Sequence, residues 1–196
     1  MPTILEAAYR HDVLRLMPAQ EGNVGVELGV AQGGFSECMV KSGRFKMFFG
    51  VDRYYNDRGH DVEQYKSALR RVGFNAPYRL LRMTFDEAYD LFEDDSLDFI
   101  YVDGYAHTGE EGGSTIYRWA HKVKPGGVIA GDDYHPRWPL VIRAVDRFAA
   151  DTGFELFLTS IMQSNTAFSS YPTWAFVKTG RTPICAPPEL ALACAS

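Results

Sequence analysis

Residues 26–34, VELGVAQGG, decide the fold of this chain. They form a short apolar run that ends in a glycine-rich turn, and a helical pattern follows through Val40. Glycine adopts backbone conformations that other residues avoid, so such a turn can be tight and a ligand can approach its backbone closely. A buried strand, a glycine turn and a helix in this order predict the first unit of an α/β fold.

The same unit recurs along the chain. Further apolar runs stand at 46–51, 78–81, 97–102 and 127–130, and helical patterns follow them at 61–72, 85–92, 111–122 and 140–152. This alternation predicts a Rossmann-like, doubly wound parallel sheet with helices on both faces. Two last strand-like runs, 154–159 and 173–178, have no helix between them and predict a C-terminal antiparallel hairpin. The expected sheet is mostly parallel and has about seven strands.

Length and composition predict one domain. The chain has 196 residues, of which 46% are hydrophobic and 23% are charged, an ordinary balance for one buried core. We expect a leading helix over 1–20, a single domain over 1–178, and a flexible, proline-containing tail over 179–196. The formal net charge of -5 argues against a nucleic-acid surface, which needs a clustered basic face.

Localisation follows from what the sequence lacks. No apolar run is long enough to span a bilayer, and the N-terminal stretch lacks the apolar core and cleavage site of a signal peptide. The three cysteines, Cys38, Cys185 and Cys194, fit neither a disulfide framework nor a zinc cluster. We therefore expect a cytoplasmic protein that binds neither membrane nor nucleic acid, and the sequence leaves open whether it forms a homo-oligomer.

Carboxylates stand at the ends of four predicted strands. They are Glu27, Asp52, Asp103, Asp132 and Asp133. Because ligands of open α/β sheets bind beyond the carboxyl ends of the strands, we expect these side chains on one rim. Crowded like charges are costly unless cations or hydrogen-bond donors compensate them, so the set as a whole indicates a ligand site. For any single Asp, a polar cap at a strand end is an equally good explanation.

Glu27 distinguishes this glycine turn from a dinucleotide site. The turn lacks the G-x-G-x-x-G pattern, and a carboxylate two residues before Gly29 is a poor neighbour for a pyrophosphate. It suits a ligand with a cationic amino-acid end, such as S-adenosylmethionine. Asp52 follows Gly29 by 23 residues, about where an acidic residue accepts hydrogen bonds from ribose hydroxyls.

Four motifs together resemble a known family. They are VELGVAQGGFS (26–36), FFGVDRY (48–54), SLDFIYVDGYAH (96–107) and KVKPGGVIAGDDYH (122–135). Their order and spacing are similar to those of class I methyltransferases, above all the methyltransferase-24 family, and more distantly to metal-dependent sugar and catechol O-methyltransferases. The resemblance covers residues 20 to 178 and implies a Rossmann-like fold that uses S-adenosylmethionine.

The resemblance also implies roles for individual residues. The cofactor-binding residues that it implies are Glu27, Gly29, Gly33, Asp52, Arg53, Thr84, Phe85 and Asp103. In this assignment Glu27 and the two glycines hold the methionine end and Asp52 holds the ribose. Thr84 and Phe85 would lie near the adenine, and Asp103 beside the transferable methyl group.

A metal ion and a general base complete the expected site. Asp103, Asp132 and Asp133 match the carboxylates that hold a divalent ion in the metal-dependent relatives, and hard oxygen ligands suit Mg²⁺, which would lower the pKa of a substrate hydroxyl. The alternative is that these residues cap helices and bind the cofactor without metal. The expected catalytic residues are Asp103 and, as general base, His107 or His135. The loop to His107 is one residue longer than the family's Asp-Gly-x-His, so its role stays open.

The sequence therefore predicts an O-methyltransferase that acts on a hydroxyl of a small molecule, with a sugar or glycoside as one candidate. Aromatic residues that flank the expected pocket, such as Tyr54, Tyr55 and Trp138, suit a flat acceptor, although many aromatic side chains belong to the core. No segment matches the Asn/Asp-Pro-Pro-Tyr/Phe tetrapeptide of amino-group methyltransferases that act on nucleic acid. Two alternatives stay open: an NAD-dependent oxidoreductase on the same fold, and a non-catalytic S-adenosylmethionine-binding protein.

Overall fold

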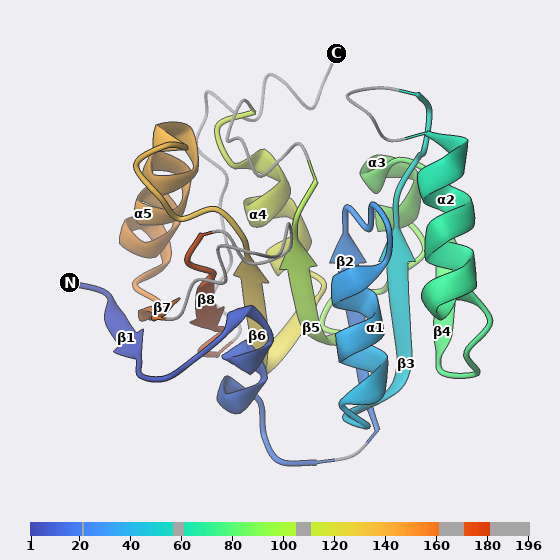
Figure 1. The fold of residues 1–196 in the computed structure, drawn as a ribbon. Coiled ribbons are helices and arrows are strands. Elements are labelled where there is room, and N and C mark those ends of the chain that lie inside the picture. Colours follow the sequence, from blue (N-terminus) through green and yellow to red (C-terminus); the bar gives the residue numbers. More distant parts are fainter. Residues whose placement is uncertain (21, 57–60, 105–110, 161–170, 181–196) are drawn as a thin grey trace.

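A single sheet organises the molecule. The computed structural model describes residues 1–20, 22–56, 61–104, 111–160 and 171–180. Its strands are β1 (Thr3–Leu5), β2 (Asn23–Leu28), β3 (Phe45–Val51), β4 (Tyr78–Leu81), β5 (Leu97–Val102), β6 (Val123–Gly131), β7 (Leu156–Thr159) and β8 (Trp174–Val177). Within the described residues these eight strands form one sheet in the order β1-β7-β8-β6-β5-β2-β3-β4 (Figure 1).

Helices lie on both faces of this sheet. They are η1 (a 3-10 helix, Arg10–Leu16), α1 (Gly34–Lys41), α2 (Val62–Ala68), η2 (a π-helix, Leu69–Gly73), α3 (Phe85–Tyr89), α4 (Ser114–Ala120) and α5 (Pro139–Thr152). The first four lie on one face, and α3, α4 and α5 lie on the other (Figure 1). The predicted doubly wound α/β architecture is confirmed.

The two cores follow from the alternation of side chains along β5. Phe99 and Tyr101 pack with apolar residues of η1 and α1, whereas Ile100 and Val102 pack with those of α4 and α5. A parallel strand that is buried on both faces reads as a nearly continuous apolar run, because successive side chains point to opposite faces. For this reason the strands at the centre of the sheet could be predicted from the sequence.

The predicted C-terminal hairpin is also confirmed. β7 and β8 pair antiparallel, and β8 lies between β7 and β6 and is antiparallel to both. All other pairs in the sheet are parallel. Insertion of β8 places Thr173 and Trp174 next to the carboxyl end of β6.

The N-terminal expectation was wrong. In place of one leading helix over 1–20, residues Thr3–Leu5 form β1, an eighth strand that pairs parallel with β7, and only Arg10–Leu16 are helical. The run Thr3-Ile4-Leu5 is apolar and β-branched at two positions, which favours a strand where a partner edge is at hand. The apolar residues of the second part, Val13, Leu14 and Met17, are buried as a helical pattern predicts.

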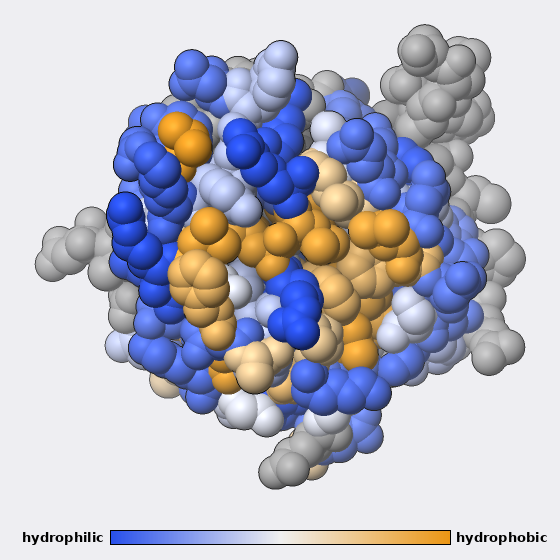
Figure 2. Space-filling model, turned by 90° about the vertical axis from the view of Figure 1, so that its right-hand side faces the viewer, coloured by the Kyte–Doolittle hydropathy of each residue, from blue (hydrophilic) through white to orange (hydrophobic). Residues whose placement is uncertain are grey.

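The end of the sheet at β4 carries exposed apolar side chains. β4 is the last strand in the sheet order, and Figure 2 shows that apolar residues gather on the side of the molecule that carries α2, β4 and α3. Exposed apolar side chains near these elements include Phe74, which is 82% exposed, and Leu91, which is 59% exposed. Among the described residues, no helix is both long enough and apolar enough to cross a membrane.

Candidate active site at the carboxyl ends of the strands

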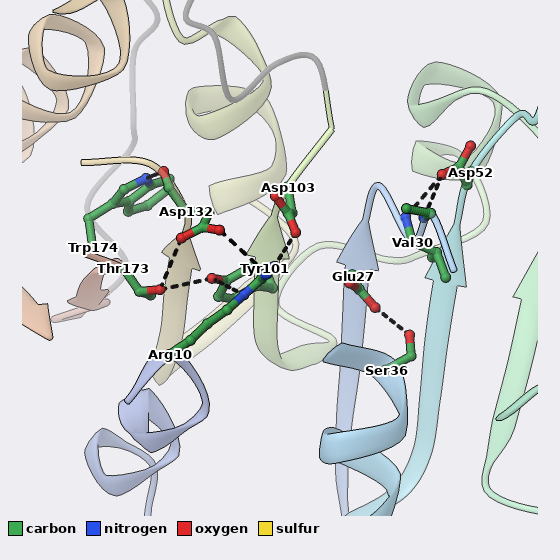
Figure 3. Close-up of polar contacts among 11 residues, drawn as sticks. Arg10, Glu27, Val30, Ser36, Asp52, Tyr101, Asp103, Asp132, Thr173 and Trp174 are labelled. Carbon is green, nitrogen blue, oxygen red and sulfur yellow. Dashed lines mark hydrogen bonds and ion pairs between the residues drawn. The ribbon is translucent and has the colours of Figure 1, made fainter. Parts of the chain in front are cut away.

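The predicted acidic rim exists. β6, β5, β2 and β3 are parallel neighbours, so their carboxyl ends share one edge of the sheet. Along this edge lie Asp132, Asp103, Glu27 and Asp52, in that order (Figure 3). The rim has two parts, because Asp103 and Asp132 share a cationic partner while Glu27 and Asp52 are bound near the glycine turn.

Gly29 brings the two parts together. Its φ of 97° is in the left-handed region, and a Cβ atom there would overlap with the carbonyl oxygen of Asp103. The absent side chain therefore lets the turn after β2 touch the backbone at the end of β5. Gly33, with a φ of 80°, precedes the first residue of α1 and allows the chain to enter that helix.

Asp52 holds the glycine turn in shape. Its Oδ2 accepts hydrogen bonds from the backbone N–H groups of Val30 and Ala31, at 3.1 and 3.0 Å, and its Oδ1 accepts one from Tyr54 at 3.1 Å. Ala31 and Tyr54 both have a φ of 47°, an unfavourable value for residues with a side chain. Hydrogen bonds to the Asp52 carboxylate offset this cost, so Asp52 has a structural task in addition to the predicted contact with ribose.

Glu27 lies beneath the turn. It is 1% exposed, and Ser36 of α1 donates a short hydrogen bond to its Oε2. The hydroxyl of Tyr78 lies 2.9 Å from Ser36 Oγ, in a space that a side chain at Gly50 would fill. Burial raises the pKa of Glu27 to about 8, and the hydrogen bond from Ser36 opposes this shift. The sequence analysis did not identify Ser36 or Tyr78.

Arg10 is the cation of the rim, and the sequence analysis missed it. It comes from the start of η1, is 5% exposed, and makes an ion pair with Asp103. Its Nη1 lies 3.4 Å from Asp132 Oδ2, and its Nε donates a hydrogen bond of 2.8 Å to the hydroxyl of Tyr101. The guanidinium carbon is 4.7 Å from the ring centre of Phe35 and 4.8 Å from that of Tyr101.

β8 closes this network into a ring. The Tyr101 hydroxyl lies 3.0 Å from Thr173 Oγ1, which donates a long hydrogen bond of 3.4 Å to Asp132 Oδ1 (Figure 3). Trp174 donates its indole N–H to the carbonyl of Asp132 at 3.0 Å. The ring therefore contains Arg10, Tyr101, Thr173 and Asp132, and it joins η1 and β5 to the residue before β8 and the residue after β6.

The electrostatics of the ring are those of a crowded acidic site. Burial opposes the charge of Arg10, but the carboxylates of Asp103 and Asp132 outweigh it, and the pKa of Arg10 is raised well above its usual value. Burial also raises the pKa of Asp132, while Arg10 opposes that shift. Asp133 is 9% exposed, and burial, with the charges of Asp132 and Asp103, raises its pKa to about 8. One guanidinium thus compensates the acidic charge only in part.

The other predicted site residues have local partners. Thr84 accepts a hydrogen bond from the Glu87 N–H and donates one to its carboxylate, which makes it the cap of α3. Phe85 packs on Gly104, where a Cβ atom would overlap with its ring. Arg53 is half-buried beside Asp52.

Of the two candidate bases, His107 and His135, the structure describes only His135. His135 Nδ1 accepts a hydrogen bond of 3.2 Å from the Arg137 N–H, and its ring centre lies 4.6 Å from that of Tyr171. A neutral His135 then carries its proton on Nε2, and the lone pair of Nδ1 is engaged by the Arg137 N–H. His107 lies outside the described residues.

Comparison with known proteins identifies the family. The family model Methyltransf_24, described as a methyltransferase domain, matches residues 26–134, which is more than half of the chain. The chain belongs to the Methyltransf_24 family. The matched range runs from the glycine turn to the residue after Asp133, so it contains every strand end of the acidic rim. The resemblance inferred from the four motifs is confirmed, and the chain contains a methyltransferase domain with the class I fold.

A curated relative and three solved structures extend this picture. The chain is 28% identical over 126 residues to the uncharacterized protein y4gI of Sinorhizobium fredii, and the match spans 62% of this chain but only 14% of that protein. The complex of the Haloferax volcanii Trm112 methyltransferase activator with a methyltransferase contains a similar chain, with a TM-score of 0.61, 16% identity, and coverage of 89% of this chain and 91% of that one.

The other two solved structures are enzymes. An O-methyltransferase from Bacillus cereus, in complex with S-adenosylhomocysteine, has a TM-score of 0.56 and 17% identity, and the match covers 80% of this chain and 74% of that one. Spermidine synthase from Thermotoga maritima has a TM-score of 0.63 and 16% identity, with coverage of 89% and 60%. At these identities the likeness concerns the Rossmann-like fold alone.

Proposed function

We propose that the Methyltransf_24 domain transfers the methyl group of S-adenosylmethionine to a hydroxyl oxygen of a small molecule, with a sugar or glycoside as the candidate acceptor. The observation that carries the proposal is the contact between the turn at Gly29 and the backbone of Asp103. A cofactor whose methionine end binds this turn would have its sulfonium methyl beside the end of β5. The acceptor would then bind over β5 and β6.

Glu27 and Asp52 are the proposed anchors of the cofactor. Glu27 offers the ammonium group of the cofactor a negative charge from beneath the turn. Because the buried carboxyl has a pKa of about 8, an ammonium that binds next to it would favour the charged form and displace a proton. Asp52 would accept hydrogen bonds from the ribose hydroxyls. Gly33, Arg53, Thr84 and Phe85 complete the proposed cofactor site.

The chemistry requires little beyond alignment and a place for one proton. The acceptor oxygen attacks the methyl carbon, and the carbon–sulfur bond breaks with its electron pair remaining on sulfur. The hydroxyl proton passes to a base, and the products are a methyl ether and S-adenosylhomocysteine. The domain supplies proximity and orientation, which can account for a large part of the rate of such a displacement. Asp103 and His107 are the proposed proton acceptors, since the Nδ1 lone pair of His135 already accepts the Arg137 N–H.

The predicted Mg²⁺ does not fit the residues as they are folded. The described residues contain no group of three or more His, Cys, Asp or Glu side chains arranged to hold a metal ion. Arg10 is paired with Asp103 and lies between it and Asp132, and Asp132 also accepts a hydrogen bond from Thr173. Mg²⁺ requires oxygen ligands at about 2.0–2.1 Å in an octahedral arrangement. The carboxylate oxygens of Asp103 and Asp132 already have these other partners and do not provide such an arrangement. Magnesium stays a prediction of the sequence, and no step of the proposed reaction uses it.

The choice of a hydroxyl acceptor rests on the sequence and on the residues around the rim. The tetrapeptide of amino-group methyltransferases that act on nucleic acid is absent from the sequence. Of the aromatic residues near the rim, Tyr54 is 1% exposed and bonds to the Ala31 carbonyl, so it is a core residue. Tyr55 is 78% exposed and Trp138 is half-buried, and these two suit contact with a flat or saccharide acceptor.

Calorimetric titration with S-adenosylhomocysteine and with NAD tests the cofactor site. We expect binding of S-adenosylhomocysteine, at least tenfold weaker in Asp52→Asn and unchanged in Glu155→Gln, a control that precedes β7 at the opposite edge of the sheet. Binding of NAD without S-adenosylhomocysteine would indicate an oxidoreductase.

A panel of hydroxyl and amine acceptors, with products identified by mass spectrometry and NMR, tests the reaction. Methylation of oxygen supports the proposal, and methylation of nitrogen contradicts it. Cofactor binding with no transfer to any acceptor would favour the non-catalytic alternative.

A further inference from the structure

The N-terminal segment supplies the charge that the acidic rim needs. Arg10 is the first residue of η1, and η1 is tied to the sheet through β1, which pairs with β7. From there the Arg10 side chain reaches across to Asp103 at the end of β5 and Asp132 at the end of β6 (Figure 3). Three segments that are far apart in the sequence thus meet at one guanidinium.

Packing and hydrogen bonds fix the position of this guanidinium. Its carbon lies near the ring centres of Phe35 and Tyr101, and its Nε donates to the Tyr101 hydroxyl. The Tyr101 hydroxyl is itself paired with Thr173, which is fully buried. A guanidinium that touches two aromatic rings and uses three of its nitrogens is part of the folded core, unlike a surface side chain that can leave the site.

The position between the two carboxylates is the one a divalent ion would require. A cation there must contact oxygens of both Asp103 and Asp132, and Arg10 directs one nitrogen at an oxygen of each. A divalent ion added at this place would have the guanidinium as a like-charged neighbour only a few Å away. Repulsion between two cations at such a distance is strong in a buried site. The Arg10 guanidinium and a divalent ion therefore exclude each other from the position between Asp103 and Asp132.

We infer that Arg10 takes the place of a divalent cation in this domain. The side chain bridges Asp103 and Asp132, holds the ends of β5 and β6 in register, and makes the acceptor side of the rim independent of bound metal. Arg10 is a positioning residue in this account, because it acts through the carboxylates that it holds and not on the acceptor or the methyl group. The inference rests on the methyltransferase site of the domain but not on the identity of the acceptor.

The direct test is a titration of the wild-type domain with Mn²⁺, followed by electron paramagnetic resonance, in the presence of S-adenosylhomocysteine. Mn²⁺ reports on sites that prefer hard oxygen ligands. We expect no binding at concentrations up to about 100 µM, a range that saturates sites of micromolar affinity. Stoichiometric binding that disappears in Asp132→Asn would overturn the inference. This readout needs no acceptor, so it stands whether or not the domain methylates a hydroxyl.

The complementary test is to remove the internal cation. Arg10→Met keeps an unbranched side chain against Phe35 and Tyr101 but leaves Asp103 and Asp132 without their counter-charge. We expect this variant to gain Mn²⁺ binding and to melt at a higher temperature when Mn²⁺ is present. The matched control is Arg15→Met, which removes the same charge from the same helix, where Arg15 is 53% exposed and contacts Asp12.

The outcomes of this variant are distinct. Gain of Mn²⁺ binding in Arg10→Met and not in Arg15→Met supports the inference. An Arg10→Met domain with wild-type stability and no affinity for Mn²⁺ would overturn it, because the carboxylates would then need no cation at all. If Arg10→Met does not fold, the wild-type titration decides.

Discussion

Ser36 of α1 donates a short hydrogen bond to Glu27 of β2, and both side chains are almost fully buried. The pair connects the first strand of the family motif to the helix that follows it. Burial raises the pKa of this Glu27 carboxyl to about 8, and the hydrogen bond from Ser36 opposes the shift. Two properties that depend on pH follow from this relationship.

The first is the stability of the domain without cofactor. In the folded domain Glu27 holds its proton up to about pH 8, whereas its ordinary pKa is 4.5. Between these values the folded state binds more protons than the unfolded chain, so the free energy of unfolding falls as pH rises, by at most about 1.4 kcal/mol per pH unit. The contribution of Glu27 to the free energy of unfolding is fully present below pH 4.5 and is lost as pH rises through about 8.

Urea denaturation between pH 5 and 8 measures this slope. Asp133, whose pKa is also raised to about 8, contributes with the same sign. Glu27→Gln keeps an acceptor for Ser36 but does not titrate, so we expect a shallower decline in this variant and an unchanged one in the exposed Glu63→Gln control. A decline in Glu27→Gln as steep as in the wild type would contradict the proposed protonation of Glu27.

The second property is the affinity for the cofactor product. If the ammonium group of S-adenosylhomocysteine binds beside charged Glu27, the carboxyl must release its proton, and affinity rises with pH up to the pKa of about 8. We expect an increase of up to about tenfold per pH unit below that value, measured by calorimetry in buffers of different ionisation enthalpy. Affinity that stays constant from pH 6 to 8 would remove Glu27 from the cofactor site.

A third prediction concerns the turn that Asp52 holds. Asp52→Asn replaces one carboxylate oxygen with an NH₂ group, which cannot accept a hydrogen bond from a backbone N–H. Depending on which oxygen is replaced, either the Tyr54 N–H or the N–H groups of both Val30 and Ala31 lose their acceptor, and we expect a loss of about 1–3 kcal/mol in the free energy of unfolding. Chemical denaturation measures it. Wild-type stability in this variant would mean that the turn does not depend on Asp52.

A fourth prediction concerns the contact between the two halves of the rim. Gly29→Ala places a Cβ atom against the backbone of Asp103 and forces a side chain into a left-handed conformation. We expect a loss of about 1–3 kcal/mol in stability from the overlap alone, together with weaker binding of S-adenosylhomocysteine. Gly126→Ala is the control, because Gly126 has a φ of 83° but no atom near the position of a Cβ. It reports the cost of backbone strain by itself, and equal losses in both variants would show that the contact at Asp103 is unimportant.

The central strands and the acidic rim were predictable because each depends on a local pattern. Runs such as that at Leu97–Val102 are apolar apart from one residue, Asp98, since both of their faces are buried, and the residue that follows the last buried position must be near the rim. The parallel arrangement then brings Asp52, Asp103 and Asp132 to the same edge without any knowledge of their contacts.

The partners of the rim were not predictable, because they depend on contacts across the fold. Ser36 meets Tyr78 only through the packing of α1 against β3 and β4, and no spacing in the sequence encodes this. Crowded carboxylates indicated that some cation or donor must compensate them, but this rule does not distinguish a metal ion from an arginine. β1 was missed because three residues are too few for a periodic signal, and with β1 the origin of Arg10 was missed as well.

The pairing of β1 with β7 also bears on the order in which the site forms. Residues 26–134 contain the family motif, yet the cation of the rim comes from before this range, and β7, which anchors it, comes from after it. During synthesis β1 emerges before the other strands of the sheet but has no partner until nearly all of the sheet has left the ribosome. Contacts between distant parts of a chain form slowly, because closing a long loop costs entropy before the contact stabilises it. Attachment of β1 is therefore expected as a late event of folding, and the acidic rim acquires its counter-charge only then.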